Sequence, residues 1–312
     1  MEPTLWENAL NRLSRYGTVF LAIITGFFTA YSLSGKQTAG TAFFKGKLIF
    51  IYLPFLMAGV IYHRILHGAW PHFQHHVENI LLGKTGAHLY FVFMLCQYYL
   101  FALLMRRWIT KQNLPTLLLF FLIFQFLFIQ KFAGGRFDLD VRHFFPTWLF
   151  TIYAGHGLYE YRQELFSFLE KHRWCLYLLT LLSLGSASYF AFTASIYSAN
   201  HVRFVLSALV ILVTMLHFLN KVIEKIRLPF LKGLTFYIYL THSIFILYAN
   251  KLVIGYWGHV WILESKLAST FYLLFIFGLT LAVCLAVLVL NELVSKLLNK
   301  KKRVVPAQEV ST

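Results

Sequence analysis

Hydrophobic residues gather in long runs along this chain, and the charged residues lie mostly between the runs. An apolar run of about 20 residues is long enough to cross the hydrocarbon layer of a membrane as a helix. The pattern therefore predicts an all-α, polytopic transmembrane helix bundle. We place its nine spans at about 17–34, 48–66, 87–105, 114–130, 145–161, 175–194, 203–220, 230–252 and 269–295.

No internal repeat or low-complexity linker interrupts this series of runs. We therefore treat residues 1–298 as one transmembrane domain and residues 299–312 as a basic cytoplasmic tail. The final run is long enough for a tilted helix or for a helix with an interfacial extension.

Composition supports a membrane protein over a soluble one. The chain is 59% hydrophobic and 13% charged, with a mean hydropathy of +0.65, whereas soluble domains carry about 25% charged residues. Its 33 Phe, 18 Tyr and 7 Trp suit lipid-facing helices and their interfacial belts. The principal partners that we expect are membrane lipids.

The net charge of +16 indicates membrane orientation here and not nucleic-acid binding. The tail and every second connection hold 18 Lys and Arg, against 10 in the remaining segments. The positive-inside rule then places the carboxyl end in the cytoplasm and, with nine spans, the amino end outside. The amino-terminal segment has no cleavable signal pattern.

The three cysteines show no CxxC pairing, and each falls within or beside a predicted span. We interpret Cys96, Cys175 and Cys284 as small core residues, not as a disulfide or metal site.

Three ordered stretches resemble the acyltransferase 3 family of membrane O-acyltransferases. The first stretch is similar to the family's second and third spans and the basic loop between them; it reads RYGTVFLAIITGFFTAYSLSG, followed by FFKGKLIFIYLPFL. The second stretch is similar to the opening of a middle span and reads GAHLYFVFMLCQYYLF. The third is similar to the signature of a late span and reads GLTFYIYLTHSIFIL. RHFFPTWLFTIYAGHGLY is a weaker match. In style the chain is similar to the polysaccharide-adhesin members of the family.

The resemblance implies transfer of an acetyl or other short acyl group to a hydroxyl of a surface polysaccharide or other extracytoplasmic glycan. The implied donor is an acyl-CoA, with acetyl-CoA first, and no metal is needed. It also implies a ten-span fold whose first span carries an Arg and, about eleven positions later, a catalytic His. The match here begins at the second span, and eleven positions after Arg15 stands Gly26. The residues that match therefore do not include the family's first-span histidine.

Two histidines are the candidate catalytic bases. His88 and His242 fall on the second and third matching stretches, and a histidine titrates near neutral pH. Tyr239 is a candidate substrate-binding residue, because Tyr239 shares a helical face with His242 and with Ser243. Each histidine also has a purely structural interpretation. His88 would then hydrogen-bond at a helix end or to a lipid headgroup, and His242 would hydrogen-bond to a neighbouring helix.

Four further residues are candidates for binding. Arg142 and Trp148 are placed where they could contact an acidic sugar or stack on one; interfacial anchoring and packing are the alternatives. Lys45 and Lys47 replace the family's arginines as donor-phosphate ligands, but lysine lacks the bidentate fork, and topology signalling alone would explain them.

The histidine-rich stretch HRILHGAWPHFQHHVEN has no HExxH pattern and contains Pro71. We interpret it as an amphipathic outer loop and predict no metal site there.

Two other functions stay open from the sequence. The same helices could form part of a glycan export system, or the chain could be a family member that has lost its chemistry. The acyl group, the acceptor and the oligomeric state do not follow from these residues.

Overall fold

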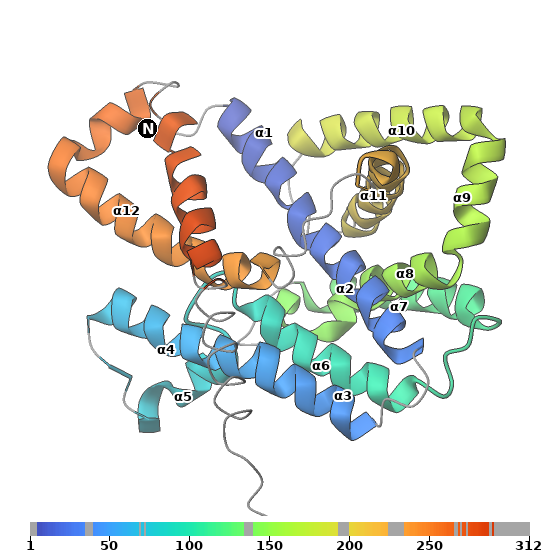
Figure 1. Ribbon diagram of the computed structural model, residues 1–312, viewed down its shortest axis with the longest axis horizontal. Helices are drawn as coiled ribbons and strands as arrows, with labels where there is room; N and C mark the ends of the chain where they lie inside the picture. The colour runs from blue at the N-terminus through green and yellow to red at the C-terminus, as the bar shows by residue number, and fades with distance from the viewer. Residues whose placement is uncertain are drawn as a thin grey trace, which may run out of the picture. The chain divides into compact units, whose positions relative to one another are not determined.

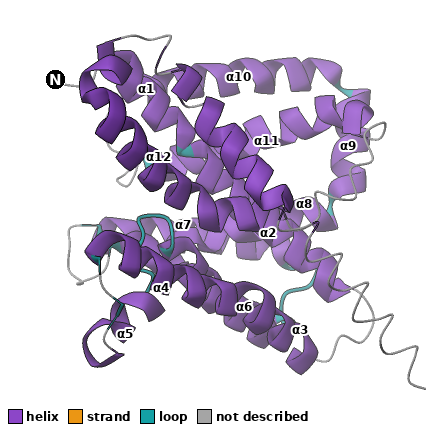
Figure 2. Ribbon diagram, turned by 60° about the vertical axis from the view of Figure 1, so that its left-hand side comes forward, coloured by secondary structure: helices purple, strands orange, loops and turns teal. Residues whose placement is uncertain are grey.

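The computed structural model describes residues 5–34, 40–68, 70–71, 73–133, 140–192, 200–223, 234–264, 268, 270–272, 274–286 and 289. Helices joined by short turns make up these residues, and no strand occurs among them (Figure 2). The prediction of an all-α fold is confirmed for this part of the chain. The predicted tail, 299–312, lies outside the described residues.

Contacts divide the chain into two compact units, Met1–Ile226 and Arg227–Thr312. The helices of the first unit are α1 (Leu5–Ser14), α2 (Tyr16–Ser34), α3 (Gly40–Lys47), a π-helix η1 (Leu48–Tyr52), α4 (Leu53–His67), α5 (Phe73–Leu81), α6 (Tyr90–Met105), α7 (Leu114–Phe132), the 3-10 turns η2 (Val141–His143) and η3 (Phe145–Trp148), α8 (Leu149–Glu160), α9 (Arg162–Lys171), α10 (Arg173–Phe192) and α11 (His201–Ile223) (Figure 1). The second unit contains α12 (Leu234–Glu264) and helical residues at 270–272 and 274–286.

Each of the nine predicted spans overlaps a helix, although residues 193–194, 230–233, 269, 273, 287–288 and 290–295 lie outside the described part. Four helical stretches in the described residues are long and apolar enough to cross a membrane: Arg12–Ser34, Ala42–His67, Leu114–Phe132 and Arg173–Phe192. Shorter apolar helices occur at Tyr90–Met105, His201–His217, Phe236–Ala249 and Thr270–Ala286. The number of crossings and their orientation stay predictions.

The second predicted span begins earlier than the sequence suggested. Residues 40–47 precede the predicted span 48–66, yet they form α3 and continue through η1 into α4. The Lys47 ammonium lies 5.3 Å from the ring centre of Phe43 and 4.8 Å from that of Tyr99. Because aromatic faces stabilise this cation, a lysine here does not end the helix.

Helices α2 and α8 pack closely, because glycine removes the side chain from both surfaces. A Cβ atom on Gly26 would overlap the carbonyl oxygen of Ile152, and one on Gly155 would overlap that of Ile23. Small residues that bring backbones together are the usual basis of helix packing inside membranes. This contact anchors the first unit around α2 and α8.

A break in the helical structure precedes α8, and glutamines from neighbouring helices hold it. Gln97 of α6 donates to the His143 carbonyl (2.7 Å) and accepts from the Phe145 amide (3.1 Å). Gln125 of α7, which is fully buried, accepts from the amides of Phe150 (2.9 Å) and Thr151 (3.3 Å). Backbone groups buried in an apolar environment need such partners.

Candidate functional site

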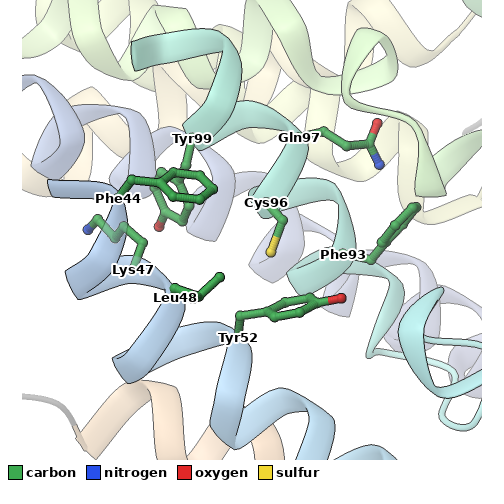
Figure 3. A pocket seen from close by; sticks show the side chains of 8 residues that line it. All are labelled: Phe44, Lys47, Leu48, Tyr52, Phe93, Cys96, Gln97 and Tyr99. Carbon is green, nitrogen blue, oxygen red and sulfur yellow. The ribbon is translucent and has the colours of Figure 1, made fainter. Parts of the chain in front are cut away.

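The residues proposed for donor binding lie on one helix but face different surroundings. Lys45 is exposed, whereas Lys47 borders a pocket of about 210 Å³ between α3, η1 and α6. Figure 3 shows Lys47 at one end of this pocket and Gln97 at the other, with Cys96 and Tyr52 between them. Phe44, Leu48, Phe93 and Tyr99 complete the lining. The structure therefore brings one of the two lysines to a cavity with a mainly apolar wall.

The π-helix contributes directly to this pocket. Leu48 and Tyr52 are its first and last residues, and both line the cavity. A π-turn places its side chains differently from a regular α-helix, and such turns recur at functional sites. Local helix geometry thus shapes the pocket, and hydropathy patterns do not reveal it.

His88 lies in the turn before α6 and contacts α4. Its Nε2 atom is 3.4 Å from the Tyr62 hydroxyl, and the two rings meet edge to face at 5.2 Å. The turn is closed by Gly83, which has φ +71 and no room for a Cβ beside the backbone of Leu89. Glycine therefore positions the backbone that carries His88.

Arg142 and Trp148 lie together in the break before α8. The Arg142 guanidinium makes two hydrogen bonds to Asp140, at 2.9 and 2.8 Å, and lies 5.1 Å from the ring centre of Tyr90. The Trp148 indole N–H donates to the Arg142 carbonyl at 3.0 Å, and its side chain is fully buried. In this structure Trp148 packs inside the protein; its contact with a sugar stays a prediction.

Two titratable groups in this segment have shifted pKa values. Burial raises the pKa of Asp140, but hydrogen bonds from Arg142 outweigh that effect and leave it below its ordinary value. Burial lowers the pKa of His143, although the nearby Asp140 partly opposes this. Near neutral pH the two residues are therefore a carboxylate and an uncharged imidazole.

His242 lies in α12, within the second unit. Its Nδ1 atom is 3.0 Å from the carbonyl oxygen of Ile238 and 2.9 Å from that of Tyr239, and its Nε2 atom is 3.2 Å from the Ser243 hydroxyl. The rings of Tyr239 and His242 are 6.2 Å apart, so the predicted shared face is confirmed. Because a carbonyl only accepts, Nδ1 carries the proton and Nε2 is the accepting nitrogen.

The predicted residues thus form separate groups. The structure brings Arg142 to Trp148, and Tyr239 to His242, and it places Lys47 at its own pocket. His88 belongs to the first unit and His242 to the second, so a meeting of the two rings stays a prediction.

Histidines also cluster in the stretch considered for metal binding. The ring of His63 lies 4.6 Å from that of His67 and 4.4 Å from that of His76. In the described part of the chain, no three His, Cys, Asp or Glu side chains are placed to hold a metal ion. The side chains of His72 and His75 are outside the description.

Sequence reasoning missed some polar residues with defined roles. Gln97 and Gln125 hold the break before α8, and the only sequence signal was a glutamine inside an apolar run. His156 lies 3.8 Å from Glu160 and stacks on Tyr153, which an i, i+4 spacing of His and Glu could have indicated.

Comparison with known proteins adds one result. A family model described as an acyltransferase domain (Acyl_transf_3) matches residues 2–289. No curated protein and no solved structure matches the chain.

Proposed function

Because the chain belongs to the acyltransferase 3 family, we propose that it transfers an acetyl or other short acyl group from an acyl-CoA-type donor to a hydroxyl of a cell-surface polysaccharide or glycan. The observation that carries this proposal is the family match over residues 2–289. Such a transfer needs a base for the acceptor hydroxyl, groups that hold the developing oxyanion, and sites that bring donor and acceptor together.

His242 is the base in this proposal. Its Nδ1–H group is directed at carbonyl oxygens of its own helix, which leaves the lone pair of Nε2 on the opposite side of the ring. The orientation that catalysis requires is therefore supplied by the backbone of α12. A general base in such a fixed position contributes roughly 10²–10⁴ to the rate.

The remaining predicted residues take supporting roles. Tyr239 lies beside His242 and positions the acceptor, and His88 serves as a second proton acceptor or donor. Arg142, already paired with Asp140, binds an acidic sugar with the part of its side chain that stays exposed. Trp148 contacts the sugar in a state in which the packing around it opens.

The pocket beside Lys47 is the proposed place of the donor. Lys47 neutralises donor phosphate at one end of the cavity, and the apolar wall receives the uncharged arm of the thioester. Lys45, exposed on the same helix, adds charge outside the cavity. Since lysine is a point charge, this contact is weaker than a bidentate arginine contact.

His242→Ala tests the proposal. Labelled acetyl-CoA is supplied to membranes that contain the protein, and O-acetyl groups on the surface glycan are measured. We expect transfer to fall roughly 10²–10⁴-fold, while His172→Gln, on the turn after α9, keeps its rate. Wild-type-like transfer by the His242 variant would disprove this role.

The same experiment separates the alternative functions. If deletion of the protein lowers the amount of surface polymer and leaves its acylation per sugar unchanged, the chain acts in export. If neither quantity changes, it is a scaffold without the family's chemistry.

A further inference from the structure

Ser243 and His242 form a pair that resembles an activated nucleophile. The Ser243 hydroxyl lies 3.2 Å from Nε2 of His242, and Nδ1 of the same ring lies 2.9 and 3.0 Å from backbone carbonyls. Nucleophilic catalysis by serine uses these three parts: a hydroxyl, a base within hydrogen-bond reach, and a group that orients the base. Here the backbone of α12 takes the place of the orienting carboxylate.

Several hydroxyl groups on the apolar helices donate to backbone carbonyls. Five of them donate to the carbonyl four residues earlier on their own helix, at 2.7 or 2.8 Å: Thr25, Thr180, Ser183, Thr241 and Thr280. This bonding satisfies a hydroxyl in an apolar environment and leaves it unreactive. Ser243 has the imidazole in reach, so its proton has a basic acceptor.

We propose that Ser243 carries the acyl group as a covalent ester between two half-reactions, an inference that rests on the proposed acyltransferase function. In the first, the Ser243 oxygen attacks the thioester carbonyl while Nε2 of His242 takes its proton. The carbon–sulfur bond breaks, and the departing thiol takes the proton from His242. The products are acyl-Ser243 and free coenzyme A.

The second half-reaction releases the acyl group. The acceptor hydroxyl attacks the ester carbonyl and passes its proton to Nε2 of His242. The bond between the acyl carbon and the Ser243 oxygen breaks, and that oxygen recovers the proton. The enzyme returns to its starting state, and the glycan carries the new ester.

A covalent ester on Ser243 would also explain how the acyl group passes between separate substrates. Ser243 belongs to the apolar helical stretch Phe236–Ala249. An ester formed there is shielded from water, which limits hydrolysis between the two half-reactions. Donor and acceptor then need not occupy the protein together.

Acyl-enzyme trapping tests the inference. Full-length protein in lipid nanodiscs is mixed with radiolabelled acetyl-CoA without acceptor, quenched in acid and separated on a denaturing gel. We expect a hydroxylamine-sensitive label on the protein, located at Ser243 by peptide mass spectrometry. Ser243→Ala and His242→Ala should lose it, and Ser243→Cys should retain a label as a thioester. Thr241→Val, which removes a neighbouring hydroxyl, should label like the wild type.

The outcomes separate this inference from the proposed function. Transfer to glycan by wild-type protein with no label, or by Ser243→Ala at the wild-type rate, would overturn the covalent step and leave the acyltransferase in place. We expect Ser243→Ala to lower transfer roughly 100-fold or more. A slower Ser243→Ala enzyme together with an unlabelled wild type would show that Ser243 only positions His242, and that also refutes the proposal. With neither label nor transfer, both proposals fail.

Discussion

The break at residues 141–148 and the stretch 239–243 both place polar groups inside apolar helices, but their hydrogen bonds run in different directions. Gln97 reaches from α6 to backbone groups in the break, and Gln125 reaches from α7 to backbone amides in the first turn of α8. In the second stretch, His242 bonds to carbonyls of its own helix, and its other nitrogen contacts Ser243. The first arrangement ties helices together, whereas the second orients a side chain.

The difference indicates which polar residues in such a chain are available for chemistry. A buried group whose bonding capacity is used by a neighbouring segment cannot be removed without loosening the fold, since the partner is left unsatisfied. A group oriented by its own helix can be replaced with little cost to packing. Substitutions of Gln97 and Gln125 should therefore lower stability, and substitutions of His242 and Ser243 should lower activity.

The largest effect on stability is expected at the α2–α8 contact, beside the break. Gly155→Ala places a Cβ against the backbone of α2 around Ile23, and the two helices must separate. We expect the free energy of unfolding to fall by about 3 kcal/mol, at the upper end of overpacking effects because backbone atoms are involved. Denaturation in mixed micelles with increasing SDS measures this change.

Gly255→Ala in α12 is the matched control. Nothing lies within 4 Å of a Cβ at that position, so alanine gains helix propensity of about 0.5–1 kcal/mol without a clash. Equal stability losses from the two substitutions would contradict the distinction between the tight backbone contact at Gly155 and the open position at Gly255.

A smaller effect is expected from Gln125→Leu. The substitution removes the acceptor for the amides of Phe150 and Thr151 at the start of α8 and leaves them buried. Each unsatisfied group costs about 1–3 kcal/mol, and relaxation of the helix start should reduce the net loss to about 2 kcal/mol. Gln130→Leu, an exposed change on the same helix, should alter stability by less than about 0.5 kcal/mol.

Activity measured on the folded fraction completes this test. Gln125→Leu should keep wild-type transfer per folded molecule, whereas His242→Ala should keep stability and lose transfer. If the Gln125 variant is stable but inactive, Gln125 itself takes part in catalysis, and the comparison is wrong.

The helices of this fold follow from the sequence, because long apolar runs have few other structures available in a membrane. The start of the second span does not follow from the sequence. Lys45 and Lys47 suggested a loop, but Lys47 lies along the rings of Phe43 and Tyr99, and that contact joins residues far apart in the chain. The roles of Gln97 and Gln125 are equally non-local, so periodicity alone does not reveal them.

The candidate site was predictable only where its geometry is local. The shared face of Tyr239 and His242 follows from their helical spacing of three. The contact of His242 with Ser243 does not follow from spacing, because consecutive residues on a helix usually point apart. The pocket beside Lys47 was not predictable, because the π-helix at Leu48–Tyr52 shapes it and a hydropathy pattern does not reveal a π-helix.

The smallest expected effect is the dependence of stability on pH. It comes from two titratable residues at the break and distinguishes this region from residues 239–243. Asp140 directly precedes the break and His143 lies within it, and both have folded-state pKa values below the ordinary ones. A lowered pKa means that the unfolded chain binds the proton more tightly, so each residue stabilises the fold above its ordinary pKa and loses that contribution as pH falls. Stability should therefore be flat from pH 8 to about 6.5, decline below about 6.5 through His143, and decline again below about 4 through Asp140.

Substitutions assign the two declines to these residues. His143→Gln should abolish the first decline, and Asp140→Asn the second, with Glu170→Gln on exposed α9 as a control that preserves both. The Asp140 contribution should stay below about 1 kcal/mol, because its pair with Arg142 is partly open to solvent and is screened. The acyl-transfer rate of folded protein should follow a separate pH profile that His143→Gln does not alter. A shift of that profile in His143→Gln would place this histidine in the catalytic machinery, since the imidazole would then serve proton transfer as well as packing.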